Sequence, residues 1–265
     1  MKPREIKNRM RGLEQTVAIT AAMQTISAAK ISPLQSRLQR SVACCAALER
    51  MLSISDVNNA FTALSRDAAP ILVVISAERG LCGKYNVMMN SATRETSLDK
   101  IVAYYPIGRD VTLPHEAVRD DAMMFLLRSP ISVAANTAAE ILSSDFESGR
   151  CDAIYVLYTD PDALNSPRLE RILPLRDAPM SESVTTEVAD EGTAFVRRVL
   201  RAKLDRIFNS ALLSENITRM AAMKFATTNG RDMLADLETV YHQTRQNDIT
   251  SELNDAVNAQ RSKEI

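Results

Sequence analysis

The chain has 265 residues, enough for one large domain or two modest ones, and its 32 lysines and arginines nearly balance 33 acidic residues, for a net charge of -1. This balance excludes a generic nucleic-acid binder, and no apolar run approaches the roughly 18 residues of a membrane span. Four cysteines without regular spacing exclude a disulfide framework and are typical of a reducing compartment.

The N-terminal stretch has the 3.5-residue apolar repeat of a coiled coil, with ten of fourteen seam positions apolar. The apolar seam residues are Ile6, Met10, Leu13, Val17, Ile31, Leu34, Leu38, Cys45, Leu48 and Leu52. The polar seam residues are Thr20, Gln24, Ser27 and Ser41.

Two local features of this predicted helix interrupt its regularity. Where the seam is polar, the neighbouring apolar residues are Ile19, Met23 and Ile26, so the buried stripe is expected to rotate around the helix. Pro33 cannot donate the backbone hydrogen bond to residue 29, so a bend is expected near it.

The middle of the chain predicts a small α/β domain. The apolar, β-branched run at 71–76 is typical of a parallel strand buried on both faces, and 101–105 and 153–158 are similar. A helix is predicted at 132–147 and an edge strand at 168–175, where Pro174 is tolerated. Strands that alternate with helices indicate a mainly parallel sheet with right-handed crossovers.

The last part of the chain, from about residue 191, predicts a second long helix. Eight of the ten prolines lie between positions 70 and 179, and only Gly192 and Gly230 interrupt the sequence after position 180. A continuous helix over 193–265 would be about 110 Å long, whereas a compact chain of this length has a radius of gyration of about 18 Å. The helix is therefore expected to project and to need a partner.

The predicted architecture is α/β: a long antiparallel coiled coil of the N- and C-terminal helices, with a small Rossmann-like domain that has a mainly parallel sheet. The expected divisions are 1–65 for the first helix, 70–180 for the α/β domain and 190–265 for the second helix. This division rests on the placement of helix-breaking residues, because glycine and proline gather in the middle part of the chain.

The loop at 78–84 follows the first strand, where α/β proteins often bind ligands, but its glycines match neither dinucleotide nor P-loop spacing. Cys82 is a conceivable nucleophile, although only His115 and His242 could serve as its base, and a buried structural thiol is the favoured interpretation. The adjacent Cys44 and Cys45 have no partners at zinc spacing. No catalytic residue, metal or cofactor is predicted.

Basic residues gather in two bands. Residues 2–11 hold five basic residues and one acidic residue, and residues 197–206 also hold five basic residues against one acidic residue. A solvated helix face is the simpler interpretation of each band. The alternative is a pair of surfaces for acidic protein partners.

Three groups of residues resemble the gamma subunit of F-type ATP synthases. The first comprises residues 6–13, 19–23 and 28–30 of the opening helix, and the second is Arg79–Gly83 with Asn86 after the first strand. The third is the C-terminal group Ser214, Glu215, Arg219–Met223, Ala226, Thr227, Asn229, Asp232, Leu237, Tyr241, Arg245, Gln246, Ile249, Thr250 and Glu252. All three occur in the family's order and with similar spacing.

The resemblance implies a central rotor shaft that couples ion movement to ATP turnover. Its terminal helices would lie inside a hexamer of alpha and beta subunits, and its α/β domain would lie beside the epsilon subunit and the membrane ring of c subunits. ATP would be made or hydrolysed on the beta subunits, so this chain would be a non-catalytic subunit without a cofactor. The implied setting is the cytoplasmic face of a bacterial inner membrane.

The resemblance also implies roles for single residues. Met23, Arg219 and Met223 match the region that couples rotation to catalysis, and Arg245, Gln246, Thr250 and Glu252 match residues that contact the beta subunits. Arg9, Lys30 and Arg79 match further family positions.

Three alternatives stay open at this point. Lys84 and Tyr85 replace the family's usual second glycine and leucine in the loop after the first strand, which fits a divergent, Na⁺-translocating member. The other two alternatives are a static coiled-coil scaffold and a cytosolic α/β enzyme that uses Cys82.

Overall fold

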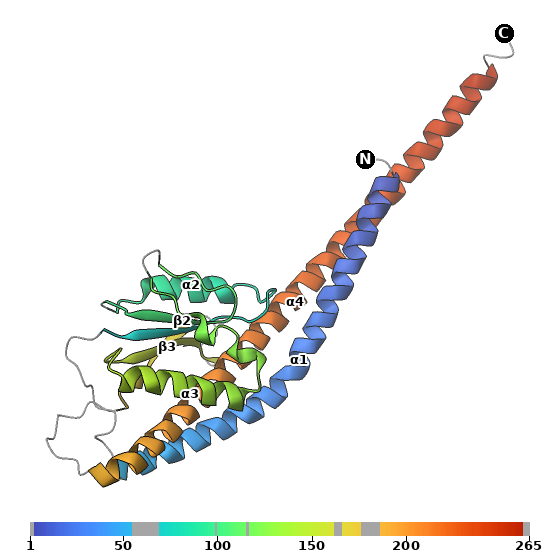
Figure 1. Cartoon of the computed structure of the whole chain (residues 1–265). Coiled ribbons are helices and arrows are strands. Elements are labelled where there is room, and N and C mark those ends of the chain that lie inside the picture. The colour runs from blue at the N-terminus through green and yellow to red at the C-terminus, as the bar shows by residue number, and fades with distance from the viewer. Residues whose placement is uncertain are drawn as a thin grey trace. The chain divides into compact units, whose positions relative to one another are not determined.

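The computed structural model describes residues 3–54, 69–98, 100–114, 117–161, 166–175 and 186–261. Two long helices, α1 (Pro3–Ile54) and α4 (Thr186–Arg261), flank a small α/β domain in the sequence (Figure 1). The chain divides into two compact units, a larger one of residues 27–219 and a smaller one of residues 1–26 and 220–265. His115, the histidine considered as a base, lies outside the described residues.

The larger unit is built on a four-stranded sheet with the order β2-β1-β3-β4. The central strand β1 (Ile71–Ile75) pairs in parallel with β2 (Ala103–Ile107) and β3 (Ile154–Thr159), and β4 (Pro167–Leu173) pairs antiparallel with β3. The mainly parallel sheet is therefore confirmed. Its second strand begins two residues later than expected and accommodates Pro106, because β2 lies at the edge of the sheet.

Helices cover both faces of this sheet, which explains why β1 is apolar at every position. Ile71, Val73 and Ile75 pack on one face with α3 (Ile131–Glu147) and with α4. Leu72 and Val74 pack on the other face with α2 (Tyr85–Glu95), a helix that the sequence analysis did not assign. All five side chains of β1 are buried, as expected for a parallel strand between two layers.

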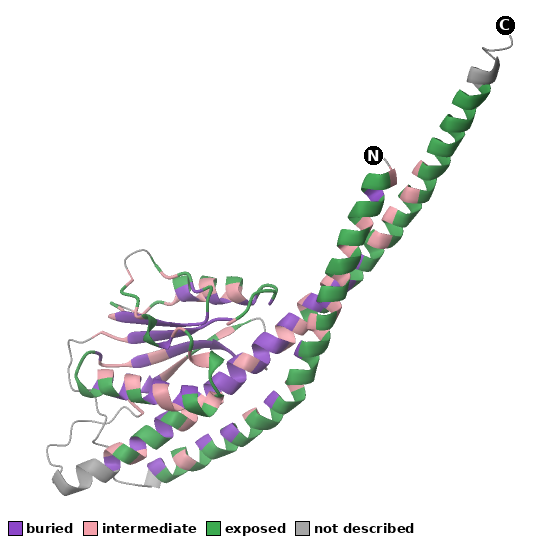
Figure 2. Ribbon diagram, turned by 45° about the vertical axis from the view of Figure 1, so that its right-hand side comes forward, coloured by how far each residue is buried: buried purple, intermediate pink, exposed green. Residues whose placement is uncertain are grey.

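The first half of α4 is the central helix of the larger unit. Leu200, Leu204 and Ile207 belong to the core of the sheet, and almost every residue from Leu204 to Arg219 is buried or half-buried. On α1, Glu49 forms an ion pair with Lys203 at 3.2 Å. Figure 2 shows this burial as the run of purple along α4 beside the sheet. The helix is enclosed because the sheet and α1 both pack against it.

The coiled-coil repeat of α1 continues through its polar positions. All fourteen seam positions are buried or half-buried, including Thr20, Ser27 and Ser41. The predicted rotation of the stripe is wrong, because Ile19 and Ile26 are 59% and 56% exposed. Helix α1 also continues across Pro33 without a break.

Hydrogen bonds explain why the polar seam residues stay inside. In the smaller unit, Thr227 Oγ1 donates to Thr20 Oγ1 at 2.9 Å, and Thr20 donates to the carbonyl of Val17 at 3.1 Å. In the larger unit, Ser41 donates to the carbonyl of Leu38 at 2.9 Å. A hydroxyl that bonds to its own helix can be buried without leaving an unpaired polar group, so the 3.5-residue period is kept where the composition suggests that it is lost.

A close approach of the two helices occurs at Gly230 in the smaller unit. A Cβ atom added at Gly230 would lie 2.5 Å from Cγ2 of Val17, too close for any real contact. Valine is β-branched and held to one rotamer in a helix, so it cannot turn aside cheaply. Glycine is kept in this helix interior because it allows the contact.

None of the helices in the described ranges has both the length and the apolar character to cross a bilayer.

Gly12 and Gly230, both within helices, predict opposite effects of the same substitution. Gly12→Ala should raise the melting temperature, because nothing lies within 4 Å of its added Cβ and alanine favours the helix by about 1 kcal/mol. Gly230→Ala should lower it, because the overpacking at Val17 costs about 1–3 kcal/mol. Thermal unfolding of the full chain, followed by circular dichroism, measures both. Val17→Ala should rescue Gly230→Ala, and a rise in both single variants would contradict the close approach.

Candidate functional site

The loop that follows β1 is fixed to α4 by one buried side chain. Nη2 of Arg219 donates to the carbonyl of Arg79 at 2.9 Å, and its Nε donates to the carbonyl of Gly80 at 3.4 Å. Leu81 and Gly83 have φ angles of 62° and 61°, so both residues adopt the left-handed backbone conformation. The Arg79–Gly83 motif thus forms a turn whose carbonyls bind the arginine of the C-terminal motif.

The beginning of α2 fixes the same loop from the other side. The side-chain oxygen of Asn86 accepts from the backbone N–H of Ala77 at 3.0 Å, and its amide group donates to Asp110 at 3.0 Å. Asn86 therefore links the segment after β1 to the segment after β2. The two motifs that the sequence analysis found in separate places are parts of one structural assembly in the larger unit.

Arg219 also forms a buried ion pair with Glu215, one helical turn earlier. Both side chains are nearly inaccessible, with 7% and 6% of their surface exposed. Burial raises the pKa of Glu215, and the charge of Arg219 opposes that shift. Removal of either partner alone would leave a buried charge unpaired, which costs about 3–5 kcal/mol.

Cys82 lies inside this assembly and is unsuited to nucleophilic chemistry. Its side chain is buried beside Tyr85 and Met89, and burial raises the pKa of the thiol. The charged groups that act on its pKa are Arg219 and Glu215, and no histidine is among them. A protonated, buried thiol without a base fits a core residue. Among the described residues, moreover, no group of three or more His, Cys, Asp and Glu could hold a metal ion.

The structure brings three of the expected site residues together. Lys30, Arg79 and Arg219 line one cavity of the larger unit, together with Glu78 and Arg109. Neither Glu78 nor Arg109 is among the site residues predicted from the sequence. A signal for both was present, since they follow the carboxyl ends of adjacent parallel strands, β1 and β2, which meet at one edge of a sheet.

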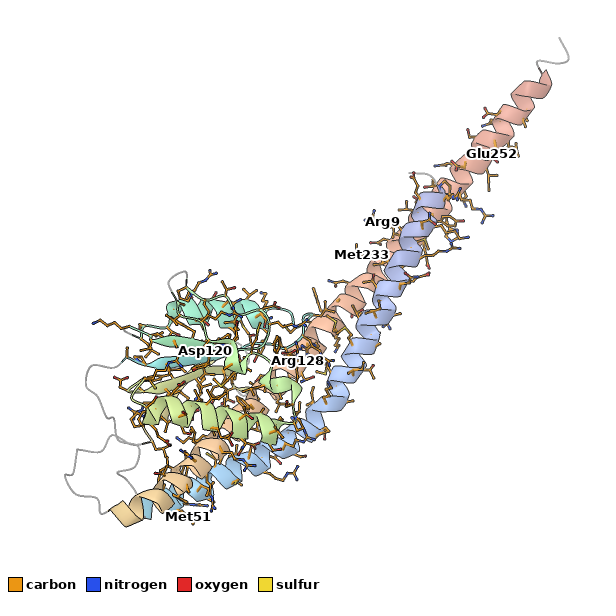
Figure 3. The ribbon with its side chains drawn as sticks, in the orientation of Figure 1. Arg9, Met51, Asp120, Arg128, Met233 and Glu252 are labelled. Atoms are coloured by element: carbon orange, nitrogen blue, oxygen red, sulfur yellow. The ribbon has the colours of Figure 1, made fainter. Side chains whose placement is uncertain are left out.

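The remaining expected site residues lie in the smaller unit and divide by exposure. Met223 is buried and Met23 is half-buried in the helix pair. The exposed residues are Arg9, Arg245, Gln246, Thr250 and Glu252, and Figure 3 shows Arg9 and Glu252 on the two helices of this unit. Only the exposed group is free to touch another protein through its side chains without rearrangement.

The C-terminal end of α4 is exposed on all sides. It continues past the N-terminus of α1 within the smaller unit (Figure 1). Every side chain from Arg245 to Val257 is exposed, including the large apolar residues Ile249, Leu253 and Val257. Spacing by four places these three on one face of the helix. A single helix with an exposed apolar face is marginal in water, so this end is suited to a partner.

The second basic band is mostly neutralised within the larger unit, which limits its proposed role as a partner surface. Arg197 pairs with Glu147, Lys203 with Glu49, and Arg206 with Glu170. The Arg206 pair also includes the hydroxyl of Tyr158, which donates to Glu170 at 2.8 Å. These contacts hold α4 against α3, the sheet and α1. The side chains that would supply most of the band's charge therefore act inside the chain.

Comparison with known proteins gives consistent matches over the whole chain. A family model described as ATP synthase matches residues 2–262. The ATP synthase gamma chain of Histophilus somni (strain 129Pt) is 27% identical over 287 residues, and that of Chlorobium luteolum is 27% identical over 281 residues. Each match covers 96% of this chain and 96% of the relative.

Solved structures show the same fold at lower identity. A chain of the Euglena gracilis mitochondrial ATP synthase, in a structure of OSCP, F1 and the c-ring, matches with a TM-score of 0.61 at 15% identity, covering 98% of this chain and 94% of that chain. A chain of the central stalk and c-ring of the Tetrahymena thermophila mitochondrial enzyme matches with a TM-score of 0.53 at 17% identity, covering 78% and 99%. The fold prediction, two long terminal helices with a parallel-rich sheet, is therefore confirmed.

The buried ion pair predicts a large effect on stability. Arg219→Gln should destabilise the chain by about 3–5 kcal/mol, because it leaves Glu215 buried without its partner and frees the carbonyls of the loop. Urea unfolding of the full chain measures this. Arg245→Gln is the matched control in the same helix, and its midpoint should not change because the side chain is exposed. Equal midpoints for the two variants would contradict the structural role of Arg219.

The cysteines predict a simple pattern of chemical labelling. Cys44 is exposed, whereas Cys45, Cys82 and Cys151 are buried. Burial raises the pKa of all three buried thiols, that of Cys151 to about 12. Iodoacetamide should therefore modify native protein at Cys44 alone, because the thiolate is the reactive form. Mass spectrometry identifies the modified site. Labelling of Cys82 at the rate of Cys44 would restore the enzyme hypothesis.

Proposed function

The chain belongs to the ATP synthase family, in which it is a gamma subunit, and we propose that its two long helices serve as the rotor shaft of the central stalk. The match from residue 2 to residue 262 includes both helices and the α/β domain, so the proposal concerns the whole chain. The shaft would turn inside a hexamer of alpha and beta subunits, driven by a membrane ring of c subunits. The neighbouring structures of F1 with the c-ring support these partners.

The exposed end of α4 is the observation that carries this proposal. Every side chain from Arg245 to Val257 is exposed, and Ile249 and Leu253 are 51% and 62% exposed. An exposed apolar helix end needs the surface of another protein around it. For a shaft that turns, this surface would surround the axis of the helix. Arg245, Gln246, Thr250 and Glu252 lie on this end, where their polar side chains would contact the beta subunits.

Mechanical coupling requires a shaft that does not twist freely. The hydrogen bond between Thr227 and Thr20 and the close contact of Gly230 with Val17 hold the helix pair of the smaller unit in one register. Met23 and Met223 lie in this pair and support it from within, whereas Arg9 on its surface would meet a partner. In the larger unit, Arg219 would act through the loop it fixes, and Lys30 and Arg79 through their exposed charges.

The chain itself is proposed to be non-catalytic. The buried Cys82 gives no nucleophile, so ATP would be made or hydrolysed on the beta subunits. The α/β domain would contact the epsilon subunit and the c-ring. With bacterial gamma chains among the relatives, the proposed location is the cytoplasmic face of a bacterial inner membrane, with attachment through the complex.

The exposed arginine at the end of α4 tests the coupling role. In the assembled complex, Arg245→Ala should lower ion-driven ATP synthesis by about tenfold, the equivalent of one lost charge-assisted hydrogen bond, while assembly is kept. Arg231→Ala is the control, since Arg231 is also exposed on α4. Equal loss in both variants, or loss of assembly in Arg245→Ala, would contradict a specific contact.

A cross-link separates a rotor from a static scaffold. Thr250→Cys, placed in a Cys44→Ser background, would be oxidised to a cysteine introduced on a beta subunit of the purified complex. ATP hydrolysis should stop on oxidation and return on reduction, because a shaft tied to the hexamer cannot turn. The same complex without oxidant is the control. Unchanged hydrolysis in the cross-linked complex would show a scaffold.

A further inference from the structure

A groove between α1, α3 and α4 has a charge that the shaft role does not explain. Two adjoining cavities, of about 450 and 380 Å³, make up this groove, and both have Ser41, Cys44 and Asp205 in their walls. All the lining residues belong to the larger unit, in which Figure 1 shows the three helices side by side. Cavities of this size are typical of sites for small molecules.

Four arginines line the groove, two from each long helix. Arg37 and Arg40 of α1 line the first cavity, and Arg198 and Arg201 of α4 line the second. All four side chains are exposed, and none of them has an ion pair in the part of the chain that the structure describes. The other three basic residues of the band at 197–206 do form ion pairs within the chain. The unpaired charges of the band are therefore those that face the groove.

A single acidic residue of the lining stands against these four cations. Asp205 is half-buried, and its carboxylate accepts a hydrogen bond from Nδ2 of Asn209 at 3.3 Å. Burial raises the pKa of Asp205, and the charge of Arg201 opposes that shift. Even with Asp205 ionised, four positive charges and one negative charge leave the groove with a net charge of +3. Like charges three residues apart on a helix repel, so each arginine pair favours an anion beside it.

The beginning of α3 adds backbone donors to the first cavity. Pro130, Ile131 and Ser132 line it, and the first turn of α3 has no acidic residue and no side-chain cap. The N–H groups at the start of a helix are unsatisfied and have a partial positive charge, so they favour an anion. They add to the attraction of Arg37 and Arg40 in the same cavity.

We propose that this groove binds a compound with two linked phosphate groups, either a free diphosphate or a lipid headgroup that carries both phosphates. One phosphate would lie between Arg37, Arg40 and the beginning of α3, and the other would lie beside Arg198 and Arg201. A guanidinium group matches two phosphate oxygens in a bidentate pair, so each arginine pair suits one phosphate. A single carboxylate or phosphate would leave one of the two pairs without a counter-charge.

The proposal goes beyond the shaft function, and an exposed cysteine allows a test without rotation. Cys44 lines both cavities, so a bound phosphate would cover its thiol and disfavour the reactive thiolate. Inorganic pyrophosphate at about ten times its Kd should slow the alkylation of Cys44 by uncharged iodoacetamide about tenfold, because only the unoccupied fraction reacts. Sodium chloride of equal ionic strength is the control. If about 10 mM pyrophosphate slows the reaction no more than the salt does, the proposal is wrong.

Two further probes identify the source of the phosphates. Vesicles of phosphatidylcholine with cardiolipin present two phosphates in a lipid headgroup, and poly-glutamate presents acidic side chains of a protein. Protection of Cys44 by pyrophosphate assigns the groove to a free diphosphate, and protection by the vesicles alone assigns it to a lipid headgroup. Protection by poly-glutamate at a lower concentration of negative charge than either would overturn the proposal in favour of an acidic protein segment.

Arg40→Gln and Arg201→Gln each remove one cation from one cavity. Both side chains are exposed, so the fold should tolerate the changes, and the melting temperature checks this. Each variant should raise by about tenfold the pyrophosphate concentration that halves the alkylation rate of Cys44. Arg94→Gln is the matched control, because Arg94 is an exposed arginine of α2 in the same unit and lines neither cavity. An unchanged value in either groove variant, or an equal rise in Arg94→Gln, would overturn the site.

Discussion

The burial of α4 is the constraint on which the rest of the structure depends. Its first half is covered by the sheet on one side and by α1 on another, and every residue from Leu204 to Arg219 is buried or half-buried. A charged side chain on a helix enclosed in this way needs a partner within the chain. The pairs of Arg206 with Glu170 and of Lys203 with Glu49 follow from that requirement, because they satisfy the polar side chains while the apolar residues pack.

The enclosed stretch of α4 ends at a buried ion pair, Arg219 with Glu215. The guanidinium group bonds to two carbonyls of the loop after β1 in addition to the carboxylate, so it uses its several donors within the chain. A lysine could not make the same set of bonds. Two motifs that lie far apart in the sequence are therefore parts of one arrangement. One supplies the arginine, and the other supplies the turn whose carbonyls bind it.

Beyond Arg219 the helix changes in character. In the smaller unit α4 is covered on the side of α1 only, and every side chain from Arg245 to Val257 is exposed. The gradient from an enclosed helix, through a helix pair, to a bare helix matches the proposed shaft, in which the bare end would be surrounded by other subunits. Figure 2 shows this gradient along α4 as purple giving way to pink and green.

The sequence by itself determined the two long helices, the buried strands and the 3.5-residue seam, because periodicity and the placement of glycine and proline are local properties of the chain. It also determined the family resemblance, which rests on residues in order. Only the tertiary structure decided that Thr20 stays in the seam while Ile19 and Ile26 face outward, since that choice depends on hydrogen bonds and on the partner helix. The cavity around Glu78 was likewise decided by topology: parallel strands bring the segments after β1 and β2 together, and α4 completes the wall from more than 100 residues away.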